Sequence, residues 1–133
     1  MKIIIDTNVL ISGIFFTGPP YQILQGWRDG RFNLILSKEI FDEYRRVAER
    51  LSLQFKSIDI HDILDLIAIN AEFFQPIKLS QNICTDPDDE KFISCALSSN
   101  SKIIVTGDKH LLKITGYKGI EIITPKAFIK KYL

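Results

Sequence analysis

The sequence contains few of the residues that form disulfides and cysteine/histidine metal sites. Only two cysteines, Cys84 and Cys95, and two histidines occur among its 133 residues. Small secreted domains depend on many more cysteines, so we expect both thiols to be reduced and to pack as small apolar side chains. With so few histidines, a zinc site formed by cysteine and histidine is not expected.

Long apolar runs are also absent from the sequence. No run approaches the roughly 20 apolar residues that a membrane-spanning helix needs. The chain opens with a β-rich segment rather than with the basic and then apolar segments of a signal peptide. We therefore expect a cytoplasmic protein that does not enter a membrane.

The sequence has neither a strong charge imbalance nor a linker. Its net charge is +1, unlike the strongly basic balance of proteins that hold duplex nucleic acid mainly through phosphate contacts. Any nucleic acid would have to be held by a local patch. Hydrophobic residues make up 46% of the chain, and no segment rich in proline, glycine and serine divides it. This composition predicts one domain, residues 1–133, with one core.

Short β-rich runs alternate along the chain with longer segments of helical periodicity. Strands are predicted near residues 2–5, 33–36, 102–105 and 121–123, and helices near 19–30, 37–51, 59–74, 87–99, 108–114 and 125–133. Such alternation is typical of βαβ units. The sequence therefore predicts an α/β fold in which helices cover both faces of a parallel sheet.

Two acidic residues directly follow predicted strands. Asp6 follows the run Ile3-Ile4-Ile5, and Asp108 follows residues 103–107. In open parallel sheets, ligands bind outside the carboxyl ends of the strands, so both acids are expected at one site. Each acid also fits a simpler role, because Asp6 can form a strand-to-loop turn and Asp108 can cap a short helix.

Two further acids lie on predicted helices. Glu43 falls about 60° around the helix axis from the apolar residue Ile40, so it can turn back toward the sheet edge. A solvated helix flank is the alternative for Glu43. Asp89 shares a helix face with Ile93 and Ala96, so its carboxylate is expected to face the core and to need a partner. Helix capping accounts for Asp86 and Asp88 just before it.

Acids gathered in a half-buried cleft either raise one another's pKa or require a cation. The spacing of these acids along the chain does not match a contiguous calcium-binding loop. Dispersed carboxylates instead suit Mg²⁺ or Mn²⁺, which bind oxygen ligands and leave room for water and a phosphate. The pattern therefore predicts a site for Mg²⁺ or Mn²⁺ formed by Asp6, Glu43, Asp89 and Asp108.

At the level of motifs, the sequence resembles the PIN-domain ribonucleases. The matching segments extend over nearly the whole chain: Ile3-Ile4-Ile5-Asp6-Thr7-Asn8, Leu36-Ser37 with Glu43, Asp86-Pro87-Asp88-Asp89 with Lys91-Phe92, and Ile104-Val105-Thr106-Gly107-Asp108. The segment Ile122-Ile123-Thr124-Pro125 also resembles the subgroup of toxins from toxin–antitoxin pairs.

This resemblance implies a three-layer α/β/α sandwich with a central, mainly parallel sheet. It also implies an endonuclease that uses Mg²⁺ or Mn²⁺ to hydrolyse single-stranded RNA. Asp6, Glu43, Asp89 and Asp108 would be the catalytic, metal-binding acids, and Asn8, Thr106 and Asp86 would be supporting residues. The implied partners are RNA, an antitoxin protein and further copies of the chain in a homodimer or higher oligomer.

Two other functions stay open on the sequence alone. One is a non-catalytic module that binds a metal or nucleic acid, and the other is a phosphoacceptor signalling domain, which also places acids at a sheet edge. Several basic residues fit either a rim that guides RNA toward the acids or an ordinary solvated face. They are Arg45, Arg46, Arg50, Lys91, Lys109, His110 and Lys113.

Overall fold

The computed structural model describes residues 1–79 and 82–133. Within these residues, five parallel strands form one sheet in the order β3-β2-β1-β4-β5. The strands are β1 (Lys2–Ile5), β2 (Asn33–Leu36), β3 (Glu72–Phe73), β4 (Ile103–Val105) and β5 (Glu121–Ile123). Strand β1 lies at the centre of the sheet, and its three isoleucines are buried.

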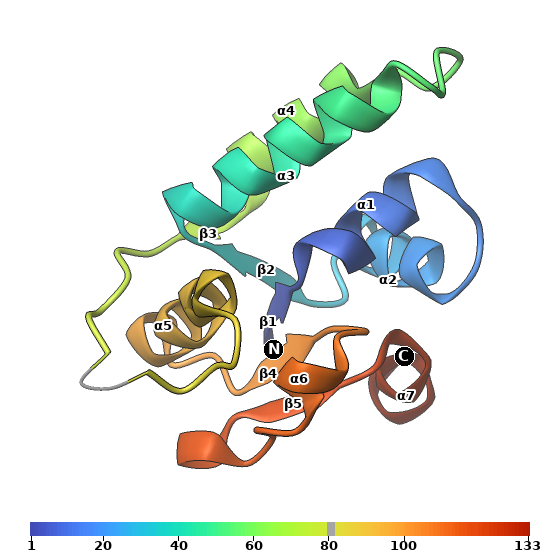
Figure 1. Cartoon of the computed structure of the whole chain (residues 1–133). Helices are drawn as coiled ribbons and strands as arrows, with labels where there is room; N and C mark the ends of the chain where they lie inside the picture. The colour runs from blue at the N-terminus through green and yellow to red at the C-terminus, as the bar shows by residue number, and fades with distance from the viewer. Residues whose placement is uncertain (80–81) are drawn as a thin grey trace.

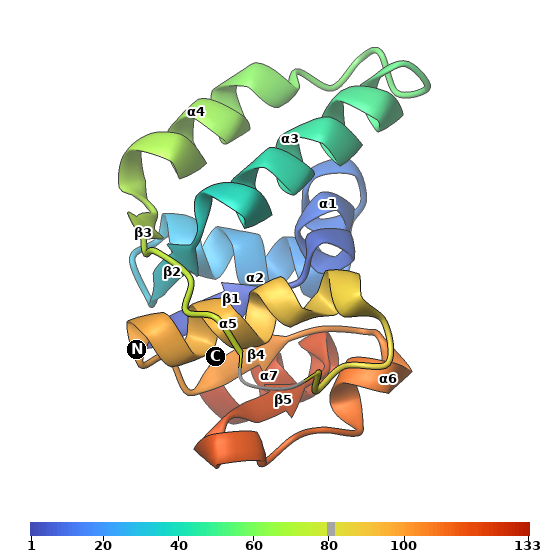
Figure 2. The ribbon, with the colours of Figure 1, turned by 60° about the vertical axis from the view of Figure 1, so that its left-hand side comes forward.

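Helices cover both faces of the sheet, which confirms the predicted α/β/α sandwich (Figures 1 and 2). The α-helices are α1 (Thr7–Phe15), α2 (Pro19–Arg28), α3 (Lys38–Ser52), α4 (Ile60–Asn70), α5 (Glu90–Ser99), α6 (Lys109–Leu112) and α7 (Pro125–Tyr132). Short 3₁₀ turns occur at η1 (Pro87–Asp89) and η2 (Tyr117–Gly119). Helix α5 packs on strands β1, β2 and β4, while α2 and α7 pack together on the opposite face (Figure 2).

Helices α3 and α4 lie side by side and extend beyond the sheet (Figure 1). A separate apolar cluster joins this pair to α1, and it includes Ile11, Phe15, Ala48, Ile60 and Leu64. Among the described residues, no helix has both the length and the apolar character needed to cross a membrane.

Two elements differ from the sequence prediction. No helix is predicted for the segment after Asp6, where a turn is one alternative, but this segment forms helix α1, because its apolar residues are buried between the sheet and the extended helix pair. The helix predicted for 59–74 ends at Asn70, and Glu72–Phe73 forms the edge strand β3. Pairing of residues 72–73 with strand β2 overrides the helical pattern of this segment. Just after β3, the amide of Phe74 donates a hydrogen bond to the carbonyl of Leu36 at 2.8 Å.

Capping side chains fix where the helices near the sheet edge begin. The Ser37 hydroxyl accepts a hydrogen bond from the amide of Ile40 at 3.3 Å, as the sequence predicts for the start of α3. Asp86 caps η1 through the amide of Asp88 at 3.0 Å. Local sequence signals therefore set the start of two elements that carry acids.

Tyr44 on α3 fixes the end of strand β1. This residue is completely buried, and its hydroxyl donates a hydrogen bond to the carbonyl oxygen of Ile5, the last residue of the strand. Because Asp6 is the next residue, the bond ties α3 to the point where the first acid leaves the sheet.

Replacement of Tyr44 by phenylalanine should lower the free energy of unfolding by about 1–3 kcal/mol, because the buried carbonyl of Ile5 loses its side-chain donor. Urea unfolding followed by circular dichroism measures this change. Tyr21→Phe is the matched control, since Tyr21 is 41% exposed and its substitution should cost less than about 0.5 kcal/mol. Equal effects of the two substitutions would contradict the role given to Tyr44.

Candidate active site

Asp6 and Asp108 lie at the carboxyl ends of the neighbouring strands β1 and β4. Asp6 is 7% exposed, and the buried hydroxyl of Thr106 donates to its Oδ2 at 2.5 Å. The same hydroxyl accepts a hydrogen bond from the backbone amide of Asp108 at 3.0 Å. Thr106 therefore connects the two strand ends and holds the Asp6 carboxylate in one orientation.

The position of Asp6 is electrostatically unfavourable for a carboxylate. Burial raises the pKa of Asp6, and the negative charges of Asp108 and Glu43 raise it further, against the lowering effect of hydrogen bonds from Thr106 and from the backbone of Thr7. The net pKa of Asp6 is raised above the ordinary value of an aspartate. The fold thus holds a carboxylate at a place where a nearby cation would stabilise its charged form.

The carboxyl group of Asp89 lies close enough to that of Asp108 for the two to interact. Burial raises the pKa of Asp89 most, and the interaction with the Asp108 carboxyl and the charges of Asp108, Asp6 and Asp86 raise it further, to about 7. The Asp89 carboxyl is therefore partly protonated at neutral pH. Asp89 is half-buried and does not reach the core with Ile93 and Ala96 as predicted, because it is the last residue of η1 and helix α5 begins only at Glu90.

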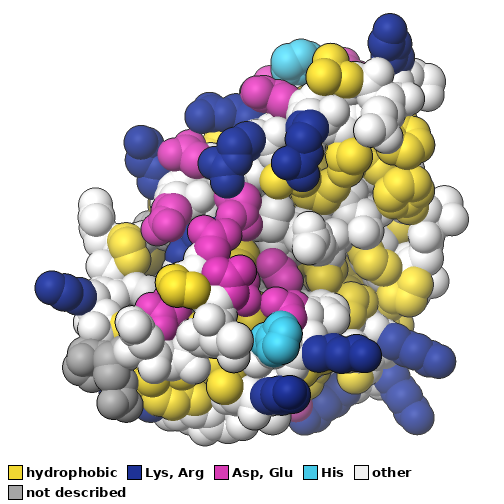
Figure 3. Space-filling model, viewed as in Figure 1, with side chains coloured by type: hydrophobic (Ala, Val, Ile, Leu, Met, Phe, Trp, Pro, Cys, Tyr) yellow, Lys and Arg dark blue, Asp and Glu magenta, His cyan; other side chains and the backbone are white. Residues whose placement is uncertain are grey.

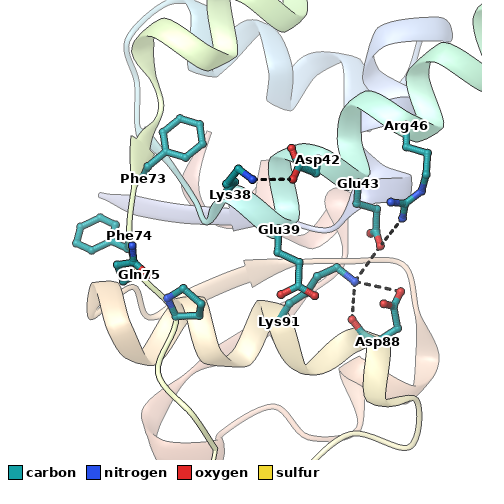
Figure 4. A pocket seen from close by; sticks show the side chains of 11 residues that line it. Lys38, Glu39, Asp42, Glu43, Arg46, Phe73, Phe74, Gln75, Asp88 and Lys91 are labelled. Carbon is teal, nitrogen blue, oxygen red and sulfur yellow. Dashed lines mark hydrogen bonds and ion pairs between the residues drawn. The ribbon is translucent and has the colours of Figure 1, made fainter.

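Glu43 approaches the same region from α3 and is only 13% exposed, so it does not form the solvated flank that the sequence allows. Its Oε1 accepts a hydrogen bond from the hydroxyl of Thr7. Its Oε2 lies 2.8 Å from Nζ of Lys91 and 3.7 Å from Nη2 of Arg46 (Figure 4). Both carboxylate oxygens of Glu43 therefore have partners within the protein.

Lys91 is the residue that the sequence interpretation missed. Its placement on a basic rim or a solvated face is wrong, because the side chain is 3% exposed. The ammonium contacts Glu43 and also the carboxylate of Asp88 at 3.0 Å (Figure 4). The signal in the sequence is Cys95, an apolar residue one helical turn away on the same face, which favours burial of Lys91.

The Lys91 ammonium keeps its charge despite its location. Burial lowers the pKa of Lys91, but the hydrogen bonds and charges of Glu43 and Asp88 raise it, and the net pKa lies above the ordinary value. The same ion pairing lowers the pKa of Asp88. The structure thus contains a permanent ion pair beside Asp6, Asp89 and Asp108, for which residues 1–79 and 82–133 provide no ion pair.

Of the predicted supporting residues, Thr106 contacts Asp6, whereas Asn8 and Asp86 are exposed. Asn8 is exposed on α1 and lines a hollow of about 470 Å³ together with Asp6 and Asp108. Asp86 is exposed, and its carboxylate caps η1 rather than pointing at the other acids. Asp108 likewise caps α6 by accepting from the amide of His110 at 2.9 Å, so its simpler predicted role is realised as well.

The acids share one face of the molecule. Figure 3 shows acidic side chains gathered at the centre of this face, with lysine and arginine side chains around them. A second hollow of about 620 Å³ begins beside Glu43 and Lys91 and extends to Phe73 and Pro76 (Figure 4).

Across residues 1–79 and 82–133, no three His, Cys, Asp or Glu side chains are grouped closely enough to hold a metal ion. The acids instead lie in the pairs described above. The carboxylate oxygens of these acids are the kind of ligand that Mg²⁺ and Mn²⁺ prefer. To bind one ion together, half-buried carboxyl groups such as those of Asp89 and Asp108 would have to rotate toward it.

The raised pKa of Asp89 predicts a pH dependence of stability in the metal-free protein. The folded state binds more protons than the unfolded state between the unfolded pKa, about 4, and the folded value of about 7. The free energy of unfolding in EDTA should therefore increase as the pH is lowered from about 8 to about 5. Urea unfolding at each pH measures this increase.

Asp89→Asn should weaken this pH dependence, whereas Asp65→Asn, at an exposed position on α4, should leave it unchanged. Identical pH dependence in wild type and Asp89→Asn would show that Asp89 does not carry the raised pKa.

Comparison with known proteins identifies the family of this chain. The family model described as PIN domain matches residues 2–110, a range that contains Asp6, Glu43, Asp89 and Asp108. The chain is also similar to the uncharacterized protein MJ1680 of Methanocaldococcus jannaschii, with 31% identity over 99% of this chain and 92% of the relative. The chain therefore belongs to the PIN-domain family, whose fold is that of a nuclease.

Proposed function

We propose that this protein is a divalent-metal-dependent endoribonuclease that hydrolyses phosphodiester bonds of single-stranded RNA. The observation that carries the proposal is the position of Asp6, Asp89 and Asp108 at the carboxyl edge of the sheet, near enough for their charges to interact, where burial and mutual repulsion raise the pKa of Asp6 and Asp89. Such an arrangement is costly for stability and favours cation binding. Membership of the PIN-domain family supports the same activity.

In this proposal Asp6, Asp89 and Asp108 hold Mg²⁺ or Mn²⁺ through their carboxylate oxygens. The bound cation supplies polarisation of the phosphoryl oxygen and a water molecule of lowered pKa. Thr106 orients the carboxylate of Asp6 toward this task. Because the pKa of Asp89 is raised to about 7, its carboxyl would have to lose a proton to serve as a ligand, so proton release near neutral pH should accompany cation binding.

Basic residues on two sides of the acids would attract the phosphates of RNA. Arg45, Arg46 and Arg50 on α3 are exposed, as are Lys109 and His110 at α6. Their charge acts locally, which suits a chain whose net charge is only +1. The acids would then lie between the basic residues of α3 and those of α6, and each basic patch would bind RNA phosphates on one side of the cleaved bond.

We also propose a biological role for this activity, as the toxin of a toxin–antitoxin pair. It rests on family membership and on the resemblance of Ile122-Ile123-Thr124-Pro125 to that subgroup. In this role the protein would act in the cytoplasm as a homodimer or higher oligomer, and an antitoxin protein would cover the acids. Co-purification with the product of a neighbouring gene that encodes a small DNA-binding protein would test this role.

Asp6→Asn should reduce cleavage of a mixed-sequence single-stranded RNA on the order of 100-fold or more, because one carboxylate is removed from the proposed cation site. Product formation is followed on denaturing gels with Mn²⁺ and with EDTA. Asp65→Asn on α4 is the matched control, since it makes the same chemical change at an exposed position. Wild type and the control should cut RNA only with metal.

Cleavage that persists in EDTA or in Asp6→Asn would contradict a metal-dependent mechanism at these acids. A rise in melting temperature with Mn²⁺ that Asp6→Asn abolishes, without cleavage of any RNA, would instead favour the non-catalytic binding module. Transfer of a phosphoryl group from a small donor to one aspartate would favour the phosphoacceptor alternative.

A further inference from the structure

Every N–H donor of the Lys91 ammonium has an oxygen partner within the protein. The ammonium has three N–H donors, and three oxygens surround it: the carbonyl of Asp88 at 2.5 Å, the carboxylate of Glu43 at 2.8 Å and the carboxylate of Asp88 at 3.0 Å. With only 3% of the side chain exposed, water has little access to replace these contacts. The ammonium is therefore a fixed part of the structure rather than a mobile surface charge.

These contacts divide the acids into two groups. Glu43 and Asp88 share the Lys91 charge, and Glu43 also contacts Thr7 and Arg46. By contrast, the ion pairs found among the described residues include none that involves Asp6, Asp89 or Asp108. Of the two groups, only the second has no ion pair with a lysine or arginine in the described part of the chain, so its oxygens are the ones open to a divalent cation.

We infer that the Lys91 ammonium occupies the place between Glu43 and Asp88 that a second divalent cation would take. The site accordingly binds a single divalent ion, through Asp6, Asp89 and Asp108. Glu43 is a positioning residue that holds Lys91 and α3 beside this ion and is not itself a ligand. The inference rests on the metal site of the proposed function, but it does not depend on cleavage of RNA.

The three oxygens around Lys91 have the chemistry of a cation site in their own right. Two come from carboxylates and one from a backbone carbonyl, and hard divalent cations bind both kinds of oxygen. While Lys91 is present, its positive charge repels a second cation and its hydrogen bonds occupy the oxygens. Removal of the ammonium should therefore expose a second site for a divalent ion.

The experiment is a Mn²⁺ titration of the RNA-free protein, in which electron paramagnetic resonance measures the free ion. Wild type should bind one equivalent, and Lys91→Ala should bind two. Lys91→Gln retains a polar side chain in case the alanine variant fails to fold, and it should also gain a second, weaker equivalent. Lys102→Ala, at an exposed lysine just before β4, is the matched control and should bind one.

Adding Asp88→Asn to Lys91→Ala should return the stoichiometry to one equivalent, because the new site loses a carboxylate. Two equivalents in wild type, or one in both folded Lys91 variants, would overturn the inference and leave the proposed nuclease activity intact. Absence of Mn²⁺ binding by wild type would instead overturn the metal site on which both proposals rest.

Discussion

Repulsion between carboxylates at the carboxyl edge of the sheet is the constraint around which the rest of this structure is arranged. The register of β1 against β4 pairs Ile5 with Val105, and the amide of Asp6 donates to the carbonyl of Val105 at 2.9 Å. Because both strands are parallel and buried, the acids that follow them must leave the sheet at the same edge. The apolar core thereby forces like charges together, at a cost in stability that a bound cation would offset.

The protein limits this repulsion in two different ways. At Asp89, whose pKa is raised to about 7, a proton replaces part of the negative charge at neutral pH, and such a proton can be exchanged for a cation. Between Glu43 and Asp88, the buried ammonium of Lys91 provides a permanent countercharge. Neighbouring acids of similar chemistry thus differ in whether a lysine already binds their oxygens, and of those without such a partner Asp6 and Asp108 line the hollow that Asn8 also lines.

Sequence patterns predict the elements whose signals are local and strong. The β-branched run before Asp6 and the capping residues Ser37 and Asp86 behave as expected, and the parallel sheet follows from the alternation of elements. Helix α1 and strand β3 were not predictable in the same way, because tertiary packing and pairing with β2 decide them. Burial of Lys91 depends on two acids from different elements, one of them 48 residues away, a relation that no local pattern reveals.

We propose that Asp6, Asp89 and Asp108 form the divalent-cation site while Glu43 remains paired with Lys91. A crystal structure with Mn²⁺, with anomalous scattering recorded near the manganese edge, would locate the ion. We expect one strong anomalous peak in contact with carboxylate oxygens of Asp6, Asp89 and Asp108, with the Glu43–Lys91 ion pair unbroken. A peak bound to Glu43, or no peak near these acids at all, would contradict it.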